Sequence, residues 1–395
     1  MKKILALILA ALMILCFVAC SQEPENEGEE EESSATGTAN EVDVFEKADD
    51  DYDDEPRKVG VAVYDLDEDG HYEITSYKPS SVEVVDIVLP DKAPDGREIV
   101  AIGAEAFKAQ NSIRSLEIPA TYERIGKHAF YECDGLVSVS MADSVVEIED
   151  GAFHKCAKLE SFTGAAAVKT VGQDAFSDCI ALKAIDLSGA VEVINTAAFR
   201  GCTALKTVTV SNNVTFIEKY AFNDCTSLKY EIADGAKYLG NSQNKFVALI
   251  SIDDLYTSAC VINDSTKLIA KNAFSNCPAL ESVTVGNGIK VIDSDCFVNT
   301  PRLTYNVYED VSYLGTKDNP YAIAMTANVP SATGIQLHKD VKMIAGDAFE
   351  KCVNLTDIDC SQITKEAWEG IYKAEGWNRD LILKIYCSDE VIELN

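Results

Sequence analysis

Residues 136–159 read LVSVSMADSVVEIEDGAFHKCAKL, and close variants of this stretch recur along most of the chain. The clearest marker is an apolar pair that ends in phenylalanine and falls every 23 residues from Phe107 to Phe222. The spacing is then 52, 23 and 52 residues up to Phe349, and each longer step is one repeat plus 29 residues. A fixed period of this length predicts a solenoid of stacked repeats, so the 395-residue chain holds one repeat domain rather than several globules.

Each repeat combines two patterns. The leucine at position 136 opens an L-x-x-V-x-M pattern whose apolar residues alternate, as in a strand with one buried face. The Ala-Phe-x-x-Cys segment at 152–156 has helical spacing but is long enough only for a turn or two. Because one unit cannot bury its apolar residues alone, neighbours must stack, with strands about 4.8 Å apart. The sequence therefore predicts an α/β solenoid of 23-residue leucine-rich repeats, with short parallel strands and short helical turns.

The repeat resembles the BspA-type leucine-rich repeat of bacterial surface proteins, through the pattern I-G-x-x-A-F-x-x-C-x-x-L. Ile125-Gly126, Ala129-Phe130, Cys133 and Leu136 show this pattern in full, and the resemblance covers roughly residues 60–395. The departures are Gln110 and Thr300 in place of the cysteine, and Cys296 in place of the alanine. The resemblance implies a leucine-rich-repeat fold and adhesion to host matrix proteins or to other cells.

Two insertions interrupt the period and are similar to each other. Residues 238–250 and 313–325 both begin with Tyr-Leu-Gly, pass through a turn rich in Asn, Asp, Ser and Lys, and end in an apolar run. This order predicts a β-hairpin in each insertion. Either the paired hairpins form a partner-binding ridge, or they only widen one edge of the ribbon. The predicted binding residues of the ridge are Tyr238, Asn241, Lys245, Phe246, Tyr313, Lys317, Asp318 and Tyr321.

The N-terminal segment predicts export. Residues 1–20 begin with Met and two lysines, continue as an apolar run from Ile4 to Ala19 and end at Cys20. The run has 16 residues, fewer than a permanent membrane span needs, so a signal peptide fits better, and the lipobox resemblance below implies one of the lipoprotein type. The run into Cys20 resembles a lipobox, which implies that Cys20 is lipidated and anchors the chain outside the bacterial membrane or at the cell surface. Cleavage followed by free secretion is the alternative.

The remaining boundaries follow from composition and from the repeat. Residues 21–55 hold 16 acidic side chains and one basic side chain, which predicts an acidic disordered tether. Residues 56–104 are predicted to form an N-terminal cap with the first rungs, and residues 105–360 the solenoid. Residues 361–395, which contain both tryptophans of the chain, are predicted to form a C-terminal cap.

Composition excludes several classes of function. The net charge of −31 argues against nucleic acid, because phosphate recognition needs a basic surface. None of the four histidines is spaced to pair with a nucleophile and an orienting acid, so no enzyme activity is predicted. No cofactor and no metal site are predicted either. Asp65, Asp67 and Asp69 mimic the start of a calcium-binding loop, but Ser76 stands where that loop needs glutamate, which favours a simple turn.

The cysteines are predicted to be structural. Neighbouring repeat cysteines should lie about 4.8 Å apart, farther than the roughly 3.8 Å between Cβ atoms of a disulfide, and a straight column cannot surround zinc. We therefore expect buried free thiols that act as small hydrophobic side chains. The repeat cysteines, three residues after a repeat phenylalanine, are Cys133, Cys156, Cys179, Cys202, Cys225, Cys277 and Cys352.

Together these features predict a lipid-anchored surface protein that binds an extracellular protein or glycoprotein and contacts the membrane only through its lipid. The alternatives are a structural envelope spacer without a specific ligand and a substrate-capture lipoprotein. The exposed strand positions do not separate these functions, because they are small, hydroxylated or acidic, and Tyr230 is their one aromatic residue.

Overall fold

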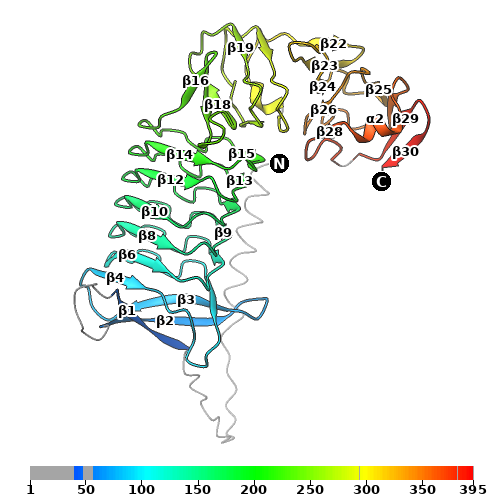
Figure 1. The fold of residues 1–395 in the computed structure, drawn as a ribbon. Helices are drawn as coiled ribbons and strands as arrows, with labels where there is room; N and C mark the ends of the chain where they lie inside the picture. The colour runs from blue at the N-terminus through cyan, green and yellow to red at the C-terminus, as the bar shows by residue number, and fades with distance from the viewer. Residues whose placement is uncertain (1–39, 48–56, 293, 380, 395) are drawn as a thin grey trace, which may run out of the picture. The chain divides into compact units, whose positions relative to one another are not determined.

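The computed structural model describes residues 40–47, 57–292, 294–379 and 381–394 (Figure 1). The predicted signal peptide, the predicted lipidation site Cys20 and most of the predicted tether lie outside the described residues. A typical coil contains a longer strand, a two-residue strand and a segment of turns that holds the repeat phenylalanine.

Two parallel ladders run through the stacked coils, because each coil contributes one strand to each ladder. The 23-residue period sets the register, so that Ser138 lies opposite Ser115 and Val139 opposite Leu116. The first ladder, in several hydrogen-bonded segments, contains β4 (Val85–Val88), β6 (Ile113–Ile118), β8 (Ser138–Met141), β10 (Ser161–Thr163), β12 (Ala184–Leu187), β14 (Thr207–Val210), β19 (Ala259–Val261), β21 (Ser282–Thr284), β25 (Gly334–Gln336), β27 (Asp357–Cys360) and β29 (Leu383–Cys387). The second ladder contains β5 (Ile99–Ile102), β7 (Arg124–Ile125), β9 (Glu147–Ile148), β11 (Thr170–Val171), β13 (Val193–Ile194), β15 (Phe216–Ile217), β20 (Leu268–Ile269), β26 (Met343–Ile344) and β28 (Tyr372–Lys373).

An antiparallel cap closes the N-terminal end of the ladders. It consists of β1 (Glu41–Glu46), β2 (Lys58–Leu66) and β3 (Tyr72–Pro79). β1 pairs with β4 of the first ladder, and β3 pairs with β5 of the second. The cap therefore joins both ladders into one sheet of 13 strands, and its hydrogen bonds cover the otherwise open first coil.

Strand β1 lies inside the range that the sequence assigned to a disordered tether, so the folded part of the chain starts earlier than expected. Val44 of this strand is fully buried. The acidic residues of β1 meet basic partners: Glu41 pairs with Lys78 at 2.8 Å and Asp43 with Lys58 at 2.6 Å. The sequence pattern did not indicate this strand because the segment around it is acidic. The lysines that balance this charge are distant in sequence, and only the folded sheet brings them close.

The prediction of an α/β solenoid with helical turns is wrong, because the described coils form a β-solenoid with almost no helix. The Phe130 N–H donates to the Ala152 carbonyl of the next coil at 2.7 Å, whereas the Tyr131 N–H donates to His128 of its own coil at 3.0 Å. This alternation leaves no run of the i to i−4 bonds that define an α-helix. His128 and Glu132 also have left-handed φ values of 54° and 58°, which a right-handed helix excludes.

The two left-handed positions recur from coil to coil, two residues before and two residues after the repeat phenylalanine. Asp174 and Asp178 occupy them in one coil, and Asn272 and Asn276 in another. Asn, Asp and Gly adopt this conformation more readily than other residues do. In other coils Ala109, Glu132 and Lys155 occupy the same positions, so residue type marks these turns only in part, and the helical spacing of Ala-Phe-x-x-Cys was misleading.

The predicted hairpins are confirmed, and each insertion is a three-stranded antiparallel meander. The last strand of each meander returns to the second ladder, where β18 pairs with β20 and β24 with β26. The first meander contains β16 (Glu231–Ala233), β17 (Ala236–Leu239) and β18 (Ala248–Ile252), and the second contains β22 (Asn306–Tyr308), β23 (Val311–Leu314) and β24 (Ile323–Ala327). The described helical elements are η1 (Ser294–Phe297) and α2 (Lys365–Glu369), and β30 (Val391–Leu394) pairs with β29 at the C-terminal end.

Phenylalanine rings form a column through the first part of the solenoid. From Phe107 to Phe222 the successive ring centroids lie 5.0–5.5 Å apart in stacked geometry, and Tyr77 extends the column into the cap at 5.2 Å. Stacking resumes after the first insertion, between Phe274 and Phe297, at 5.0 Å. Burial of each ring stabilises the fold by about 1.5–3 kcal/mol, so the column is a principal part of the core.

The predicted inward column of cysteines is confirmed from Cys133 to Cys225, all of which are buried. The Cys156 thiol donates to the Phe130 carbonyl of the preceding coil at 3.1 Å, and the other four cysteines of this run repeat the bond at 3.0–3.1 Å. Burial also raises the pKa of the Cys179 thiol. All eleven cysteines in the described ranges are free thiols.

The Phe176→Ala substitution should lower the free energy of unfolding by about 3–5 kcal/mol, because it leaves a cavity between two stacked rings. Urea denaturation measures this loss. Phe45→Ala is the control, because Phe45 is 42% exposed and its truncation should cost less than about 1 kcal/mol. Equal losses for the two variants would show that the column does not carry the core.

Iodoacetamide should leave Cys156, Cys179 and Cys202 unmodified in the native protein and should label them after denaturation. These thiols are buried, and alkylation requires an accessible thiolate. Cys387 is partly exposed and should be labelled first. Peptide mapping by mass spectrometry reads each site, and rapid native labelling of Cys179 would contradict the buried column.

Candidate functional site

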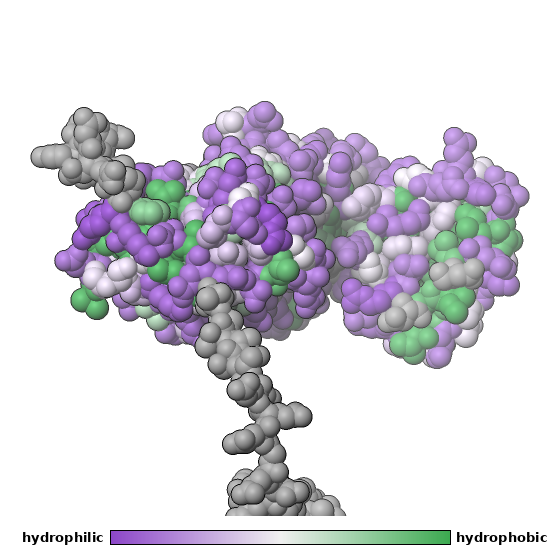
Figure 2. Space-filling model, turned by 90° about the horizontal axis from the view of Figure 1, so that it is seen from below, coloured by the Kyte–Doolittle hydropathy of each residue, from purple (hydrophilic) through white to green (hydrophobic). Residues whose placement is uncertain are grey.

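The first ladder presents columns of polar side chains. In-register pairing places equivalent side chains of successive coils beside one another, and Asp186 and Thr209 are hydrogen-bonded across two coils. Seen from below, hydrophilic residues predominate on the described surface, and hydrophobic ones form small separate patches (Figure 2). One column contains Ser115, Ser138 and Ser161, and the next contains Glu117, Ser140 and Thr163.

The predicted aromatic residues of the two hairpins belong to the core. Tyr238 is 1% exposed and Tyr313 is fully buried. Phe246 lies edge-on to Tyr238 at 5.3 Å, and Tyr321 lies edge-on to Tyr313 at 5.6 Å, so each pair packs its own insertion. Because a buried ring cannot touch a partner, both tyrosines act by holding the meander in shape.

Asn241 is also occupied within its own loop. Its side-chain NH₂ donates to the Val210 carbonyl at 2.7 Å, and its oxygen accepts from the backbone N–H groups of Gln243 at 2.9 Å and Asn244 at 3.1 Å. These bonds fix the turn between β17 and β18 against the coil that ends at β14. Its role in the structure is therefore to position the hairpin.

Two asparagines that sequence reasoning missed hold the insertions in the same way. Asn244 donates to the Ser265 carbonyl at 2.8 Å and accepts from the Phe246 N–H at 2.9 Å. Asn319 donates to the Asp340 carbonyl at 2.6 Å and accepts from the Tyr321 N–H at 2.9 Å. The shared signal in the sequence is an asparagine two residues before an aromatic residue in the loop of each hairpin.

Three of the predicted hairpin residues have exposed side chains, namely Lys245, Lys317 and Asp318. Lys245 lies 3.5 Å from Glu231 on the neighbouring strand β16. The described ring contacts join the aromatic residues within each insertion, so the eight predicted residues form two local sets. In each hairpin the charged side chains face solvent, whereas Tyr238 and Tyr313 pack inside.

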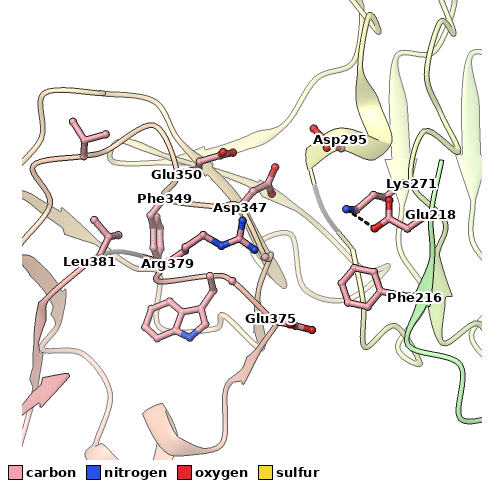
Figure 3. A pocket seen from close by; sticks show the side chains of 14 residues that line it. Phe216, Glu218, Lys271, Asp295, Asp347, Phe349, Glu350, Glu375, Arg379 and Leu381 are labelled. Atoms are coloured by element: carbon pink, nitrogen blue, oxygen red, sulfur yellow. Dashed lines mark ion pairs between the residues drawn. The ribbon is translucent and has the colours of Figure 1, made fainter. Parts of the chain in front are cut away.

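An open groove of about 550 Å³ lies between the coil that carries β15 and the C-terminal cap (Figure 3). On one wall Lys271 pairs with Glu218 at 2.8 Å and lies over the Phe216 ring at 5.5 Å. On the other wall Phe349 and Trp377 meet edge-on at 6.2 Å. Five carboxylates and two basic groups line the groove, which favours a cationic ligand over an anionic one.

Sequence reasoning also missed an exposed pair of apolar residues just after the first insertion. Leu255 is 50% exposed and Tyr256 is 80% exposed, in the connection between β18 and β19. The available signal was an apolar pair within a run of turn-forming residues, Asp253-Asp254 before it and Thr257-Ser258 after it.

Within the ranges that the structure covers, no group of three histidine, cysteine or acidic side chains is placed to hold a metal ion. Among those same residues, no helix has the length and apolarity that crossing a bilayer requires.

A family model described as BspA type leucine rich repeat region matches residues 100–229 and 253–374, in 6 copies. The unmatched gap coincides with the first meander, β16 to β18. No curated protein matches the chain.

Several solved structures are similar to the chain. A leucine-rich-repeat protein of T. pallidum is 26% identical over 55% of this chain and 87% of its own, with a TM-score of 0.43. A leucine-rich cell surface protein of Faecalibacterium prausnitzii is 21% identical over 85% of this chain and 94% of its own, with a TM-score of 0.38. A leucine-rich-repeat protein of Bacteroides ovatus is 20% identical over 85% of this chain and 100% of its own, with a TM-score of 0.37.

The Asn244→Ala and Asn319→Ala substitutions should each lower the free energy of unfolding by about 1–3 kcal/mol, because each leaves a carbonyl and an N–H without their partner. Urea denaturation measures the effect. Ser242→Ala is the control in the same loop, because its side chain is exposed, and it should change stability by less than about 0.5 kcal/mol. Asparagine variants as stable as this control would refute the bracing role.

Proposed function

Because this chain belongs to the family of BspA-type leucine-rich-repeat proteins, we propose that it is a surface protein that binds a protein or glycoprotein outside the cell and so mediates adhesion. In this proposal the chain is a binding scaffold and not an enzyme. The similar protein of Faecalibacterium prausnitzii is described as a cell surface protein, in keeping with the proposed location.

One observation carries the proposal: the coils repeat their backbone in register while their outward side chains differ from coil to coil. At one set of equivalent positions the residues are Glu117, Ser140 and Thr163, and farther along the ladder Asp186 lies opposite Thr209. A fixed backbone with variable side chains can match a large partner surface without changing the fold. A spacer without a ligand would not require this variation.

The proposed attachment is a lipid on Cys20. The apolar run that ends at Cys20 and the acidic stretch that follows it support this attachment. The anchor would hold the chain at the membrane, and the acidic stretch would separate the folded repeats from the lipid.

Cells that express the full chain should bind at least one of a panel of immobilised matrix proteins and mucins more strongly than cells without the chain. Soluble purified chain should compete with this binding. Cys20→Ala should release the chain into the medium or leave it unprocessed, and adhesion should fall with the surface amount. Cell counting and surface immunoblotting measure the two effects.

Two controls make the experiment decisive. Mass spectrometry of the N-terminus reports whether the mature chain begins at a lipidated cysteine. Protease added to intact cells reports whether the repeats are exposed. Surface-exposed chain that changes adhesion to none of the proteins would count against the proposed function, whereas a non-lipidated but adhesive chain would remove only the anchor.

A further inference from the structure

The exposed pair Leu255 and Tyr256 sits at the tip of a tight turn. The Thr257 N–H donates to the Asp254 carbonyl at 3.0 Å, which closes a β-turn with Leu255 and Tyr256 at its two central positions. The Asp254 carboxylate also accepts from the Tyr256 N–H at 2.9 Å. Polar residues usually occupy such positions. Packing within the fold therefore does not explain why two large apolar side chains lie exposed at this tip.

The turn is held against the first meander. The Asp253 N–H donates to the Gly235 carbonyl at 2.8 Å, and the Lys237 ammonium lies 3.2 Å from the Asp253 carboxylate. A Cβ on Gly235 would lie 3.2 Å from the Thr257 methyl group, so the two turns are in close contact. A braced turn presents its side chains at a small entropy cost on binding.

The second insertion contains the same turn with different residues at its tip. The Asn328 N–H donates to the Asp310 carbonyl at 2.7 Å, and the Ala332 N–H donates to the Val329 carbonyl at 3.0 Å, which repeats both backbone bonds of the first turn. In this turn the central residues are Pro330 and Ser331. The fold therefore does not need leucine and tyrosine at the tip, and they are free to serve another role.

The surroundings of the first tip are acidic. Asp234, Asp253 and Asp254 are all exposed, and Lys237 is the basic residue paired with one of them. In the second insertion, Asn328 and Val329 occupy the positions that correspond to Asp253 and Asp254. The second insertion has two exposed acidic residues beside its turn, Glu309 and Asp310, so the first tip differs from it by the aspartates within the turn itself.

We propose that the turn at residues 253–258, defined here as the Leu-Tyr tip, is the contact element that inserts into an apolar socket with a basic rim on a protein partner. Tyrosine in the centre and charges at the edge are the arrangement of a binding hot spot. Charge complementarity selects the partner: three aspartates favour lysine and arginine around the socket and disfavour both anionic lipid surfaces and a second copy of this acidic chain. This inference rests on the proposed protein-binding function and assigns it a residue-level site.

The test selects ligands from a phage-displayed library of random peptides on the purified full chain and measures their affinity by fluorescence polarisation. Selected peptides should combine aliphatic or aromatic residues with lysine or arginine. The double variant Leu255→Pro with Tyr256→Ser copies the tip of the second insertion and should bind at least tenfold more weakly, because it keeps the turn and loses the apolar contact. Asp253→Asn with Asp254→Asn should reduce binding and its sensitivity to salt.

Two exposed residues elsewhere give matched controls. Val82 is 94% exposed and Val84 is 60% exposed, so Val82→Ser and Val84→Ser remove exposed apolar surface and should leave peptide affinity unchanged. Thermal denaturation followed by circular dichroism should give the double variant the melting temperature of the unaltered chain.

The proposal is overturned if the selection yields no peptide that depends on the Leu-Tyr tip, or if the selected peptides are acidic. Tip-dependent binding to vesicles of phosphatidylcholine, with no tip-dependent peptide, would also overturn it and assign the tip to a membrane. The cell-adhesion experiment separates this inference from the proposed function. If cells carrying the double variant adhere as before, the tip is not the site but the function stands, and if the unaltered chain supports no adhesion, the function itself fails.

Discussion

The in-register stacking of coils one strand spacing apart is the constraint on which the rest of this structure depends. It sets the hydrogen bonds of both ladders, and it also sets those of the turn segments, where N–H groups alternate between the next coil and their own. The same spacing brings phenylalanine rings to 5.0–5.5 Å and places each thiol of the Cys133–Cys225 run beside a carbonyl of the preceding coil. Each core side chain must therefore pack against the equivalent side chain of the next coil.

Stacking also explains why the insertions take the form that they do. A chain that leaves the coil must return in register, and β18 and β24 do so by pairing with β20 and β26. The aromatic residues of the hairpins are used inside the meanders to make this return rigid. Consequently these hairpin aromatic residues are not free for binding, whereas Leu255 and Tyr256, in the connection after β18, are exposed.

The sequence predicted some features of the fold and misled on others for identifiable reasons. The period gave the solenoid and the cysteine column, because both depend on spacing, and the order of aromatic, turn-forming and apolar residues gave the hairpins. The helical spacing of Ala-Phe-x-x-Cys pointed to helical turns, but hydrogen bonds between coils replace those within a helix, and left-handed residues such as His128 and Glu132 interrupt it. At the candidate site, the aromatic chemistry of Tyr238 and Tyr313 favours binding residues, but their burial depends on packing that the hairpin pattern does not specify.

By itself the sequence determined the repeat, the places where it is interrupted and the acidic character of the chain, since these follow from residue identity and spacing. Only the tertiary structure decided that Glu41–Glu46 is a strand, that the hairpin tyrosines are core residues and that Leu255 and Tyr256 stand exposed on a braced turn. The physical reason is the same in each case. Exposure and pairing depend on contacts between residues that are remote in sequence, such as Asp43 with Lys58 and Asp253 with Gly235, and a local pattern carries no record of them.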